Sequence, residues 1–408
     1  MRVLLCLLSA QHVPNLLSVH HYQPDRLVLI ESHGMQKKRA AANLLAALKL
    51  GGLDYANQPG GERSHVEPLE NEDDLEAIRR ALRQAYARYP GAEWLVNVTG
   101  ATKPMSIATY DFFNGLIRRG VLSGQLLYTN MSQPERIIDL ENHSAVTCTH
   151  RLSIKQFLAG YGFESRKADR KLAEAEARAR SWWECSRAIA QRQGTEPVLA
   201  LSDEERGRAR SRRGFDLKPG HVHPTCVPVL KPFADCFSLQ IKNGELCGKI
   251  DKYAGDYLTG GWLEAFLWGV LDRQAGDLGI WDVRLGMDIG RVGDATGNDF
   301  DVSFMRANGL CMIECKSGSQ AHDPQGDVLY RIEAVIRQFR ALRVQSWLAT
   351  TSANLLDRQT GDVKTHIATR ANIYGCHLIL HDQIVKLAEN PDDVALLQSV
   401  LFSASNDS

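Results

Sequence analysis

The sequence lacks any pair of cysteines at CxxC spacing. Its nine cysteines are scattered over the chain, at positions 6, 148, 185, 226, 236, 247, 311, 315 and 376. This scatter argues against a structural zinc site and against a disulfide framework. It predicts that the protein works in a reducing cytoplasm.

Net charge and long apolar runs are also absent. The 408 residues include 48 Lys and Arg against 48 Asp and Glu, so no global field draws the protein toward nucleic acid or a membrane. Any polyanion must therefore be bound by local clusters. The apolar start at residues 2–9 is short, which predicts a first β-strand and not a signal peptide or a membrane span. The length of the chain allows two or three domains. The sequence shows no internal repeat.

Strand and helix signals alternate over residues 1–140. Apolar runs predict strands at 3–8, 27–30, 94–98 and 125–131, and helical periodicity predicts helices at 36–50, from 75 to 89 and from 104 to 120. This alternation predicts a doubly wound parallel sheet.

A polar turn, TGATK at residues 99–103, lies between a predicted strand and a helix that Pro104 opens. Open α/β folds bind ligands at this carboxyl edge of the sheet, and the free amides of a helix N-terminus favour phosphate. The sequence contains neither a Walker A loop nor a Rossmann glycine fingerprint. On pattern alone, a polar helix cap without any ligand explains the turn equally well.

The middle of the chain is predicted to be helical and locally basic. Between residues 166 and 213, thirteen Lys and Arg stand against eight Asp and Glu. A solvated helical connector is the simpler interpretation, and a patch that faces nucleic acid is the alternative. Prolines 224, 228 and 232 mark a linker, after which Asn243 and Gly244 predict a hairpin.

A second α/β unit is predicted from residue 257 onward. It begins with a helix that carries Glu264, followed by strands at 283–289, 300–305 and 310–316. An amphipathic helix through residues 329–339, strands at 344–349 and 376–380, and a helix after Pro391 complete the unit.

Asp301 and Glu314 project from neighbouring strands of this unit. Glu314 and Lys316 are two residues apart and share a face, whereas Ile313 and Cys315 face the core. Two carboxylates and an ammonium on one face are costly to desolvate unless a divalent cation joins them. The set fits metal-assisted hydrolysis of a phosphodiester, and the surrounding elements are the parts of a PD-(D/E)xK nuclease core. The bare pattern is weak, because a solvated sheet edge also produces it.

The charge of each side chain in this set predicts its role in catalysis. Asp301 and Glu314, with the Cys315 carbonyl, are expected to hold Mg²⁺ or Mn²⁺, which activates a water and polarises the phosphate. Lys316 is expected to orient that water or help deprotonate it, and to neutralise charge in the transition state. Glu264 is within reach of the metal directly or through water.

Three motifs together resemble the nuclease half of a CRISPR-associated effector family: GGWLE at 260–264, NDFDV at 298–302 and IECK at 313–316. In that family a CARF ligand-sensing domain is fused to a restriction-endonuclease-like domain. In the N-terminal half, SAQHVPN at 9–15 resembles the first ligand loop of the family, and NVTGATKPM at 97–105 resembles its TGGTK signature. Ala101 stands where the family usually has glycine. Asp299 stands where Glu is common, and a solvated acid explains it better than a metal ligand.

The resemblance implies a Rossmann-like CARF domain at 1–148, a helical connector at 149–236 and a PD-(D/E)xK domain at 237–408. It also implies a homodimer in a prokaryotic cytoplasm whose paired sensor domains clasp one cyclic tetra-adenylate. The expected ligand contacts are Ser9, Gln11, Asn15, Thr99, Gly100, Thr102 and Lys103. The expected catalytic residues are Glu264, Asp301, Glu314 and Lys316, and the metal ligands are Asp301, Glu314, Glu264 and the Cys315 carbonyl.

The function predicted on these grounds is a messenger-activated, metal-dependent endonuclease of type III CRISPR antiviral defence. It would nick DNA, cut single-stranded RNA or DNA, or do both. One alternative is a nucleotide-binding regulator whose nuclease-like domain does not cleave. Another is an unregulated repair-type nuclease. The joint presence of Asp301, Glu314 and Lys316 weighs against the regulator, and the turn at 99–103 weighs against the unregulated enzyme.

Overall fold

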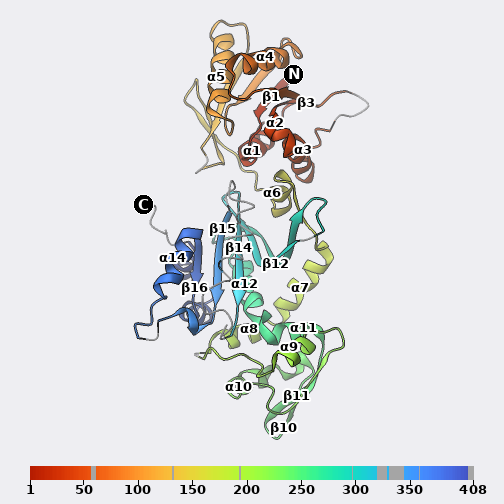
Figure 1. The fold of residues 1–408 in the computed structure, drawn as a ribbon, viewed down its shortest axis with the longest axis vertical. Helices are drawn as coiled ribbons and strands as arrows, with labels where there is room; N and C mark the ends of the chain where they lie inside the picture. Colours follow the sequence, from red (N-terminus) through yellow and green to blue (C-terminus); the bar gives the residue numbers. More distant parts are fainter. Residues whose placement is uncertain are drawn as a thin grey trace.

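A computed structural model describes residues 1–56, 61–130, 133–192, 194–295, 297–318, 329, 344–357 and 359–402. The molecule is elongated (Figure 1), with the N-terminal domain at one end, a six-stranded sheet in the middle and a small three-stranded sheet at the other end. None of the helices formed by the described residues is long and apolar enough to cross a membrane.

The N-terminal sheet has seven strands in the order β3-β2-β1-β4-β5-β6-β7. The strands are β1 Arg2–Leu7, β2 Arg26–Ser32, β3 Ser64–Leu69, β4 Glu93–Asn97, β5 Gly124–Thr129, β6 Arg136–Asp139 and β7 Ala145–Thr147. The first five are parallel, and β6 and β7 add an antiparallel edge. This confirms the predicted parallel α/β sheet.

Helices cover both faces of this sheet. The helices are α1 Val13–Tyr22, α2 His33–Lys37, α3 Ala40–Leu50, α4 Leu75–Ala87 and α5 Lys103–Arg118. Alternate residues of β1 enter different cores: Leu4 packs with α1 and α3, and Leu5 packs with α4 and α5. The single helix expected over 36–50 is two helices, because Arg39 adopts a left-handed conformation (φ 56°) between α2 and α3.

The central sheet has the order β16-β15-β14-β13-β12-β8. Its strands are β8 Phe163–Ser165, β12 Ile280–Arg291, β13 Asn298–Arg306, β14 Gly309–Lys316, β15 Val344–Thr350 and β16 Cys376–Ile379. Pairing is antiparallel from β8 to β14 and parallel from β14 to β16. Three further helices accompany β16: α14 Thr365–Tyr374, α15 His381–Glu389 and α16 Val394–Phe402. The amphipathic helix expected through 329–339 lies outside the described residues except for Leu329, which is helical and buried.

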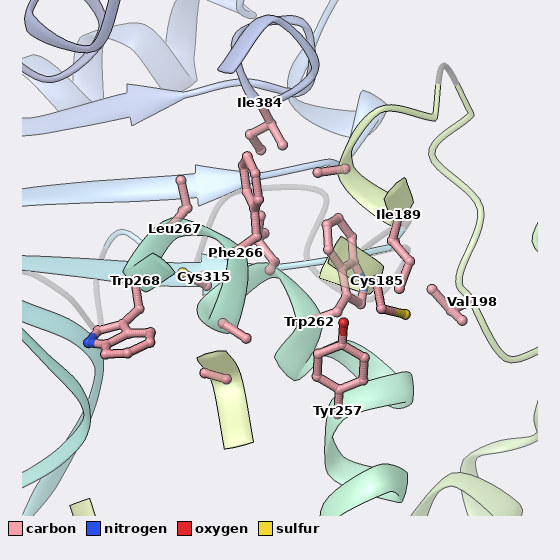
Figure 2. Packing of buried hydrophobic residues seen from close by; sticks show 14 of the residues in the cluster. Cys185, Ile189, Val198, Tyr257, Trp262, Phe266, Leu267, Trp268, Cys315 and Ile384 are labelled. Carbon is pink, nitrogen blue, oxygen red and sulfur yellow. The ribbon is translucent and has the colours of Figure 1, made fainter. Parts of the chain in front are cut away.

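Helix α12, Trp262–Arg273, is the centre of the larger core. It is buried nearly all round, which fits its almost continuous apolar sequence. Figure 2 shows its side chains between α8, which carries Cys185 and Ile189, and α15, which carries Ile384. Glu264 departs from this pattern at the start of the helix, where it places a carboxyl group in the first turn.

The segment expected as a connector contributes to the central domain. Helices α7 Asp169–Ser181 and α8 Trp183–Ala190 supply residues to the core around α12, and β8 pairs with β12. Beyond them lie α9 Asp203–Ala209, α10 Val227–Leu230, the 3-10 helix η1 Lys231–Phe237 and α11 Lys252–Asp256. The small sheet consists of β9 Phe215–Leu217, β10 Gln240–Lys242 and β11 Glu245–Ile250. The predicted hairpin is confirmed: Asn243 and Gly244 link β10 to β11 with φ of 51° and 82°.

A short stretch of chain, residues 150–154, joins the N-terminal domain to the central sheet. Leu152 N donates to Asn308 Oδ1 (2.8 Å), and Trp281 Nε1 donates to the Leu152 carbonyl (2.7 Å). Ile154 N donates to Asp282 Oδ2 (2.7 Å). Helix α6, Ile154–Gly160, then packs in the same apolar cluster as α1 and α3. The two domains are thus joined by hydrogen bonds and by a continuous apolar core.

Candidate active site and ligand-binding turn

The carboxylates predicted to bind metal lie at one end of the central sheet and on the adjoining helix. Asp301 comes from β13, Glu314 from β14 and Glu264 from the first turn of α12. A π-helical turn, η2 (Tyr257–Gly261), precedes α12 and reaches a φ of 155° at Gly260. Only glycine adopts this conformation readily, so Gly260 permits the turn that positions Glu264.

Hydrogen bonds hold the acidic groups to the end of β14. Asp301 Oδ2 accepts the N–H of Cys315 at 2.6 Å. Lys316 Nζ pairs with Glu314, donates to the Cys315 carbonyl at 3.2 Å and lies 3.8 Å from Asp301 Oδ2. Cys315 itself is buried in the core, as predicted, and so is Ile313.

The acidic groups perturb one another strongly. Burial, together with the charges of Glu264 and Glu314, raises the pKa of Asp301 to about 8. Burial likewise raises the pKa of Glu264. Burial alone would lower the pKa of Lys316, but Glu314 and Asp301 outweigh it and raise that pKa. Such shifts concentrate at sites that bind cations or perform acid–base chemistry.

The donor set fits a hard divalent cation that keeps part of its water shell. Among the described residues, no group of three or more His, Cys, Asp or Glu side chains forms a ready-made metal cage. However, the Lys316 ammonium makes contact with Glu314 and the Cys315 carbonyl and lies near Asp301, so one cation already bridges these oxygen donors. Mg²⁺ typically takes one or two carboxylates and completes its shell with water and substrate phosphates. These residues can therefore hold such an ion.

A cleft of about 1100 Å³ opens in front of this site. Glu264, Cys315 and Lys316 are among the residues that line it. Basic residues also line it, including Lys167 on the β8–α7 connection and Arg210 after α9. The only sequence signal for these basic residues is the basic run at 166–213, which the simpler interpretation takes as a solvated face.

Among the described residues, Asp299 makes no hydrogen bond or ion pair with the residues of the carboxylate cluster. It is exposed and stands opposite Asp288 on β12. This agrees with the interpretation of Asp299 as a solvated acid.

In the N-terminal domain the two predicted ligand loops meet. β1 and β4 are neighbours, and the order of the strands reverses between them, so the loops after both strands lie together. A β-carbon on Gly100 (φ 90°) would come within 3.0 Å of Ser9 Oγ, which shows how closely the loops approach. Ser9 Oγ also accepts the N–H of Gln11 at 3.0 Å, and this bond shapes the first loop.

The side chains of these loops divide into exposed and internally bonded groups. Lys103 is exposed at the first position of α5, and Thr102 caps that helix by accepting the N–H of Met105 at 3.4 Å. Thr99 is buried and accepts the N–H of Thr129 at 2.8 Å. Asn15 is fully buried, where its amide donates to the Leu7 carbonyl and accepts from Asn97. In this structure Asn15 therefore holds the loop rather than facing outward.

A doubly wound sheet with an anion-compatible turn, joined to an acidic site in a nuclease-like core, is the architecture of a ligand-sensing nuclease. Residues 3–157 match the family described as the Card1 CARF domain, and residues 251–389 match the Card1-like endonuclease domain. The chain belongs to this family of CARF-domain endonucleases. The two matched regions leave residues 158–250 between them.

Two solved structures share the fold over nearly the whole chain. Can2 from Sulfobacillus thermosulfidooxidans, solved in complex with cyclic tetra-adenylate, is 18% identical, with a TM-score of 0.66, and the alignment covers 99% of this chain and 100% of that one. Protein VC1899 from Vibrio cholerae is 17% identical, with a TM-score of 0.73 and coverage of 95% and 96%. A comparison with curated proteins finds no match.

Proposed function

We propose that this protein is a metal-dependent endonuclease of type III CRISPR antiviral defence that cyclic tetra-adenylate activates. One observation carries the proposal. In a domain of an endonuclease family, Asp301 and Glu314 meet at Lys316, whose side chain lines a basic cleft together with Glu264.

The site residues have distinct tasks in this proposal. Asp301, Glu314, Glu264 and the Cys315 carbonyl would hold Mg²⁺ or Mn²⁺, which supplies Lewis-acid activation of water and of the phosphate. Because Glu314 and Asp301 keep Lys316 protonated, its ammonium orients the attacking water and offsets negative charge on the phosphate. Asp301 must be ionised to take part, and its raised pKa makes that ionisation depend on a bound cation.

The N-terminal sensor domain controls cleavage in this proposal by binding the messenger. The fold relative Can2 was solved with cyclic tetra-adenylate, and the loops after β1 and β4 offer hydroxyl groups, backbone amides and the Lys103 ammonium to a phosphate. We assign Ser9, Gln11, Thr99, Gly100, Thr102 and Lys103 as ligand contacts, and Asn15 as the residue that supports their loop. A ring-shaped ligand suits a two-fold pair of sensor domains, so we propose a homodimer.

The test is a cleavage assay with purified full-length protein. Supercoiled plasmid, single-stranded DNA and single-stranded RNA are each incubated with Mg²⁺ or Mn²⁺, with and without cyclic tetra-adenylate. Wild type should cut at least one substrate, and only with both metal and messenger. Glu314→Gln, which keeps the side chain's size, should be inactive, whereas Asp299→Asn should cut normally.

Each departure from this pattern has a definite meaning. Cutting that ignores the messenger refutes the activation and supports an unregulated nuclease. Messenger binding without any cutting supports the non-cleaving regulator instead. Full activity of Glu314→Gln refutes the assignment of the active site. The substrate that is cut decides between DNA and RNA.

A further inference from the structure

Part of the cleft lining comes from residues that neither family match covers. Six basic residues between positions 158 and 250 line the cleft, and we call them the cationic wall: Lys167, Lys171, Arg178, Arg206, Arg210 and Arg212. We propose that the cationic wall binds the phosphodiester backbone of the substrate, with Arg210 as the phosphate contact nearest to the cleaved bond. This inference rests on the proposed function, since it names how that site holds its substrate.

Charge in the cleft departs from the balance of the chain. Among the residues that the structure describes, eight Lys and Arg line the cleft, namely the cationic wall with Lys252 and Lys316. Four acids line it: Glu174, Asp251, Asp256 and Glu264. The whole chain has 48 of each sign, so this twofold excess is local. A strip of positive charge that leads to a hydrolytic site is the electrostatic footprint of a polyanion.

Two of the four acids are already engaged. Asp251 caps α11 by accepting the N–H of Ala254 at 2.8 Å. Glu174 pairs with Arg170, which is not a lining residue, at 2.9 Å. Glu264 belongs to the proposed active site. The fourth acid, Asp256, lies near Lys252 and Arg210, whose charges oppose the rise in its pKa that burial causes. Within the wall, Arg206 pairs with Asp203 at 3.7 Å. The cations that line the cleft still outnumber its acids, so net positive charge remains for phosphates.

Arg210 is fixed in place beside the active site. Its Nε donates to Thr259 Oγ1 at 2.8 Å, and its Nη2 donates to the Thr259 carbonyl at 3.1 Å. Thr259 belongs to the π-helical turn η2 that precedes Glu264. A guanidinium has five N–H donors, and Arg210 makes no further hydrogen bond among the described residues. The remaining donors are free to bind two oxygens of a phosphate in the fork geometry that arginine favours.

Two close approaches set the position of Arg210. A β-carbon on Gly255 would come within 1.9 Å of the Ala209 carbonyl oxygen, so α11 packs backbone to backbone against the end of α9. A β-carbon on Gly260 would lie 3.6 Å from Arg210 Nη2 and 3.0 Å from Ser317 Oγ. Ser317 directly follows Lys316, so Arg210 stands next to the catalytic end of β14. The charge of Arg210 also acts on Glu264, since it opposes the rise in the pKa of that group that burial and Glu314 cause.

An aromatic ring accompanies the positive charge. Tyr253 is 47% exposed in the cleft, and the Arg178 guanidinium lies over its ring at 3.9 Å. Exposed rings combined with cations are typical of surfaces that hold nucleic acid, because bases stack on the ring while phosphates meet the cations. An acidic peptide would have no need of such a ring.

The experiment measures binding separately from cleavage. A fluorescent 20-nucleotide single-stranded DNA or RNA is titrated with full-length protein carrying Glu314→Gln, with cyclic tetra-adenylate present, at several salt concentrations. Arg210→Ala should weaken binding about tenfold, as expected for loss of one charge-assisted phosphate contact. It should also reduce the slope of log affinity against log salt by about 1. Arg210→Lys should recover part of the affinity, and Arg213→Ala, exposed and outside the cleft lining, should change nothing.

A second variant separates loss of a phosphate contact from a disturbance of the fold, which Arg210→Ala alone cannot do. Arg212 lines the cleft and makes no hydrogen bond or ion pair among the described residues, so Arg212→Ala disturbs no contact yet should also reduce the salt slope. Unchanged affinity and salt slope in both variants would overturn the proposal. If wild type cleaves and the Arg210→Ala enzyme keeps its KM, the inference fails and the proposed function stands. If no substrate is ever cleaved but binding depends on Arg210, the inference stands and the nuclease function fails.

Discussion

The replacement of Asp301 by Asn tests the electrostatics of the site without relying on catalysis. The two side chains have nearly the same shape, and the amide oxygen of Asn can still accept the N–H of Cys315. The substitution therefore removes one negative charge from beside Glu264 and Glu314 and leaves the packing intact. We expect the variant to be inactive in cleavage and, in the absence of metal, more stable than wild type at pH 8.

The direction of the pH effect follows from the pKa of Asp301. Its folded-state pKa, about 8, lies above its ordinary value of 3.8, so the folded protein keeps a proton that the unfolded chain releases. The associated stability is fully present below about pH 4 and is lost as the pH rises toward 8. At about 1.4 kcal/mol for each tenfold change in proton affinity, the loss has an upper bound of roughly 6 kcal/mol. Lys316 offsets part of the charge, so we expect Asp301→Asn to gain about 2 to 3 kcal/mol at pH 8.

The assay is thermal unfolding of the full-length protein in EDTA at pH 5 and pH 8. The gain should appear as a rise in Tm of about 1 °C for each kcal/mol in a chain of 408 residues and should shrink at pH 5. Mg²⁺ or Mn²⁺ at ten times its Kd should then stabilise wild type by about 1.4 kcal/mol and leave the Asn variant nearly unchanged. Asp299→Asn is the matched control, since it removes an exposed charge two residues away. A variant no more stable than wild type at pH 8, or one that metal stabilises equally, would refute the reasoning.

Two further predictions concern other parts of the chain. Lys103→Ala should weaken binding of cyclic tetra-adenylate about tenfold in calorimetry, because an exposed ammonium at a helix N-terminus is lost. Arg119→Ala, at the other end of α5, is the control and should leave the affinity unchanged. Equal affinities of the Lys103→Ala variant and wild type would show that Lys103 does not contact the ligand. Gly255→Ala should destabilise the protein by about 1 to 3 kcal/mol in urea unfolding, because its β-carbon would collide with the Ala209 carbonyl oxygen. Gly207→Ala, which meets open space within α9, should instead stabilise slightly, and no difference between the two would contradict the close packing of α9 on α11.

Local pattern was enough to predict the strands that lie inside the sheets. The strands β1, β2 and β4 are buried on both faces, so they are largely apolar runs. β13 alternates, and β14 is an apolar run that alternates only at its end. β3 was not predicted, because it contains Pro68 and the buried polar Ser64 and Glu67. β8 has only three residues and depends on pairing with β12, which is more than a hundred residues away in the chain. Such long-range pairing leaves no local signal.

The same division applies to the candidate site. The convergence of Asp301, Glu314 and Lys316 follows from strand periodicity, because the three lie at one end of adjacent strands. The position of Arg210 does not follow from any periodicity of the sequence. It depends on the backbone contact between Gly255 and Ala209, and the sequence spacing of these two residues does not predict that contact. Likewise, the buried hydrogen bonds of Asn15 become visible only when β4 places Asn97 beside it.

The pairing of β8 with β12 and the packing of α7 and α8 on α12 have a practical meaning for protein engineering. A fragment that starts at residue 251, where the endonuclease match begins, would lose all three elements. It would leave the edge of β12 without its partner and would open the apolar face of α12 to water, which invites aggregation. A chimera that gives this nuclease a different sensor should therefore be joined at the segment 150–154, before β8, and the new sensor must cover the apolar surface of α6 that α1 and α3 cover here.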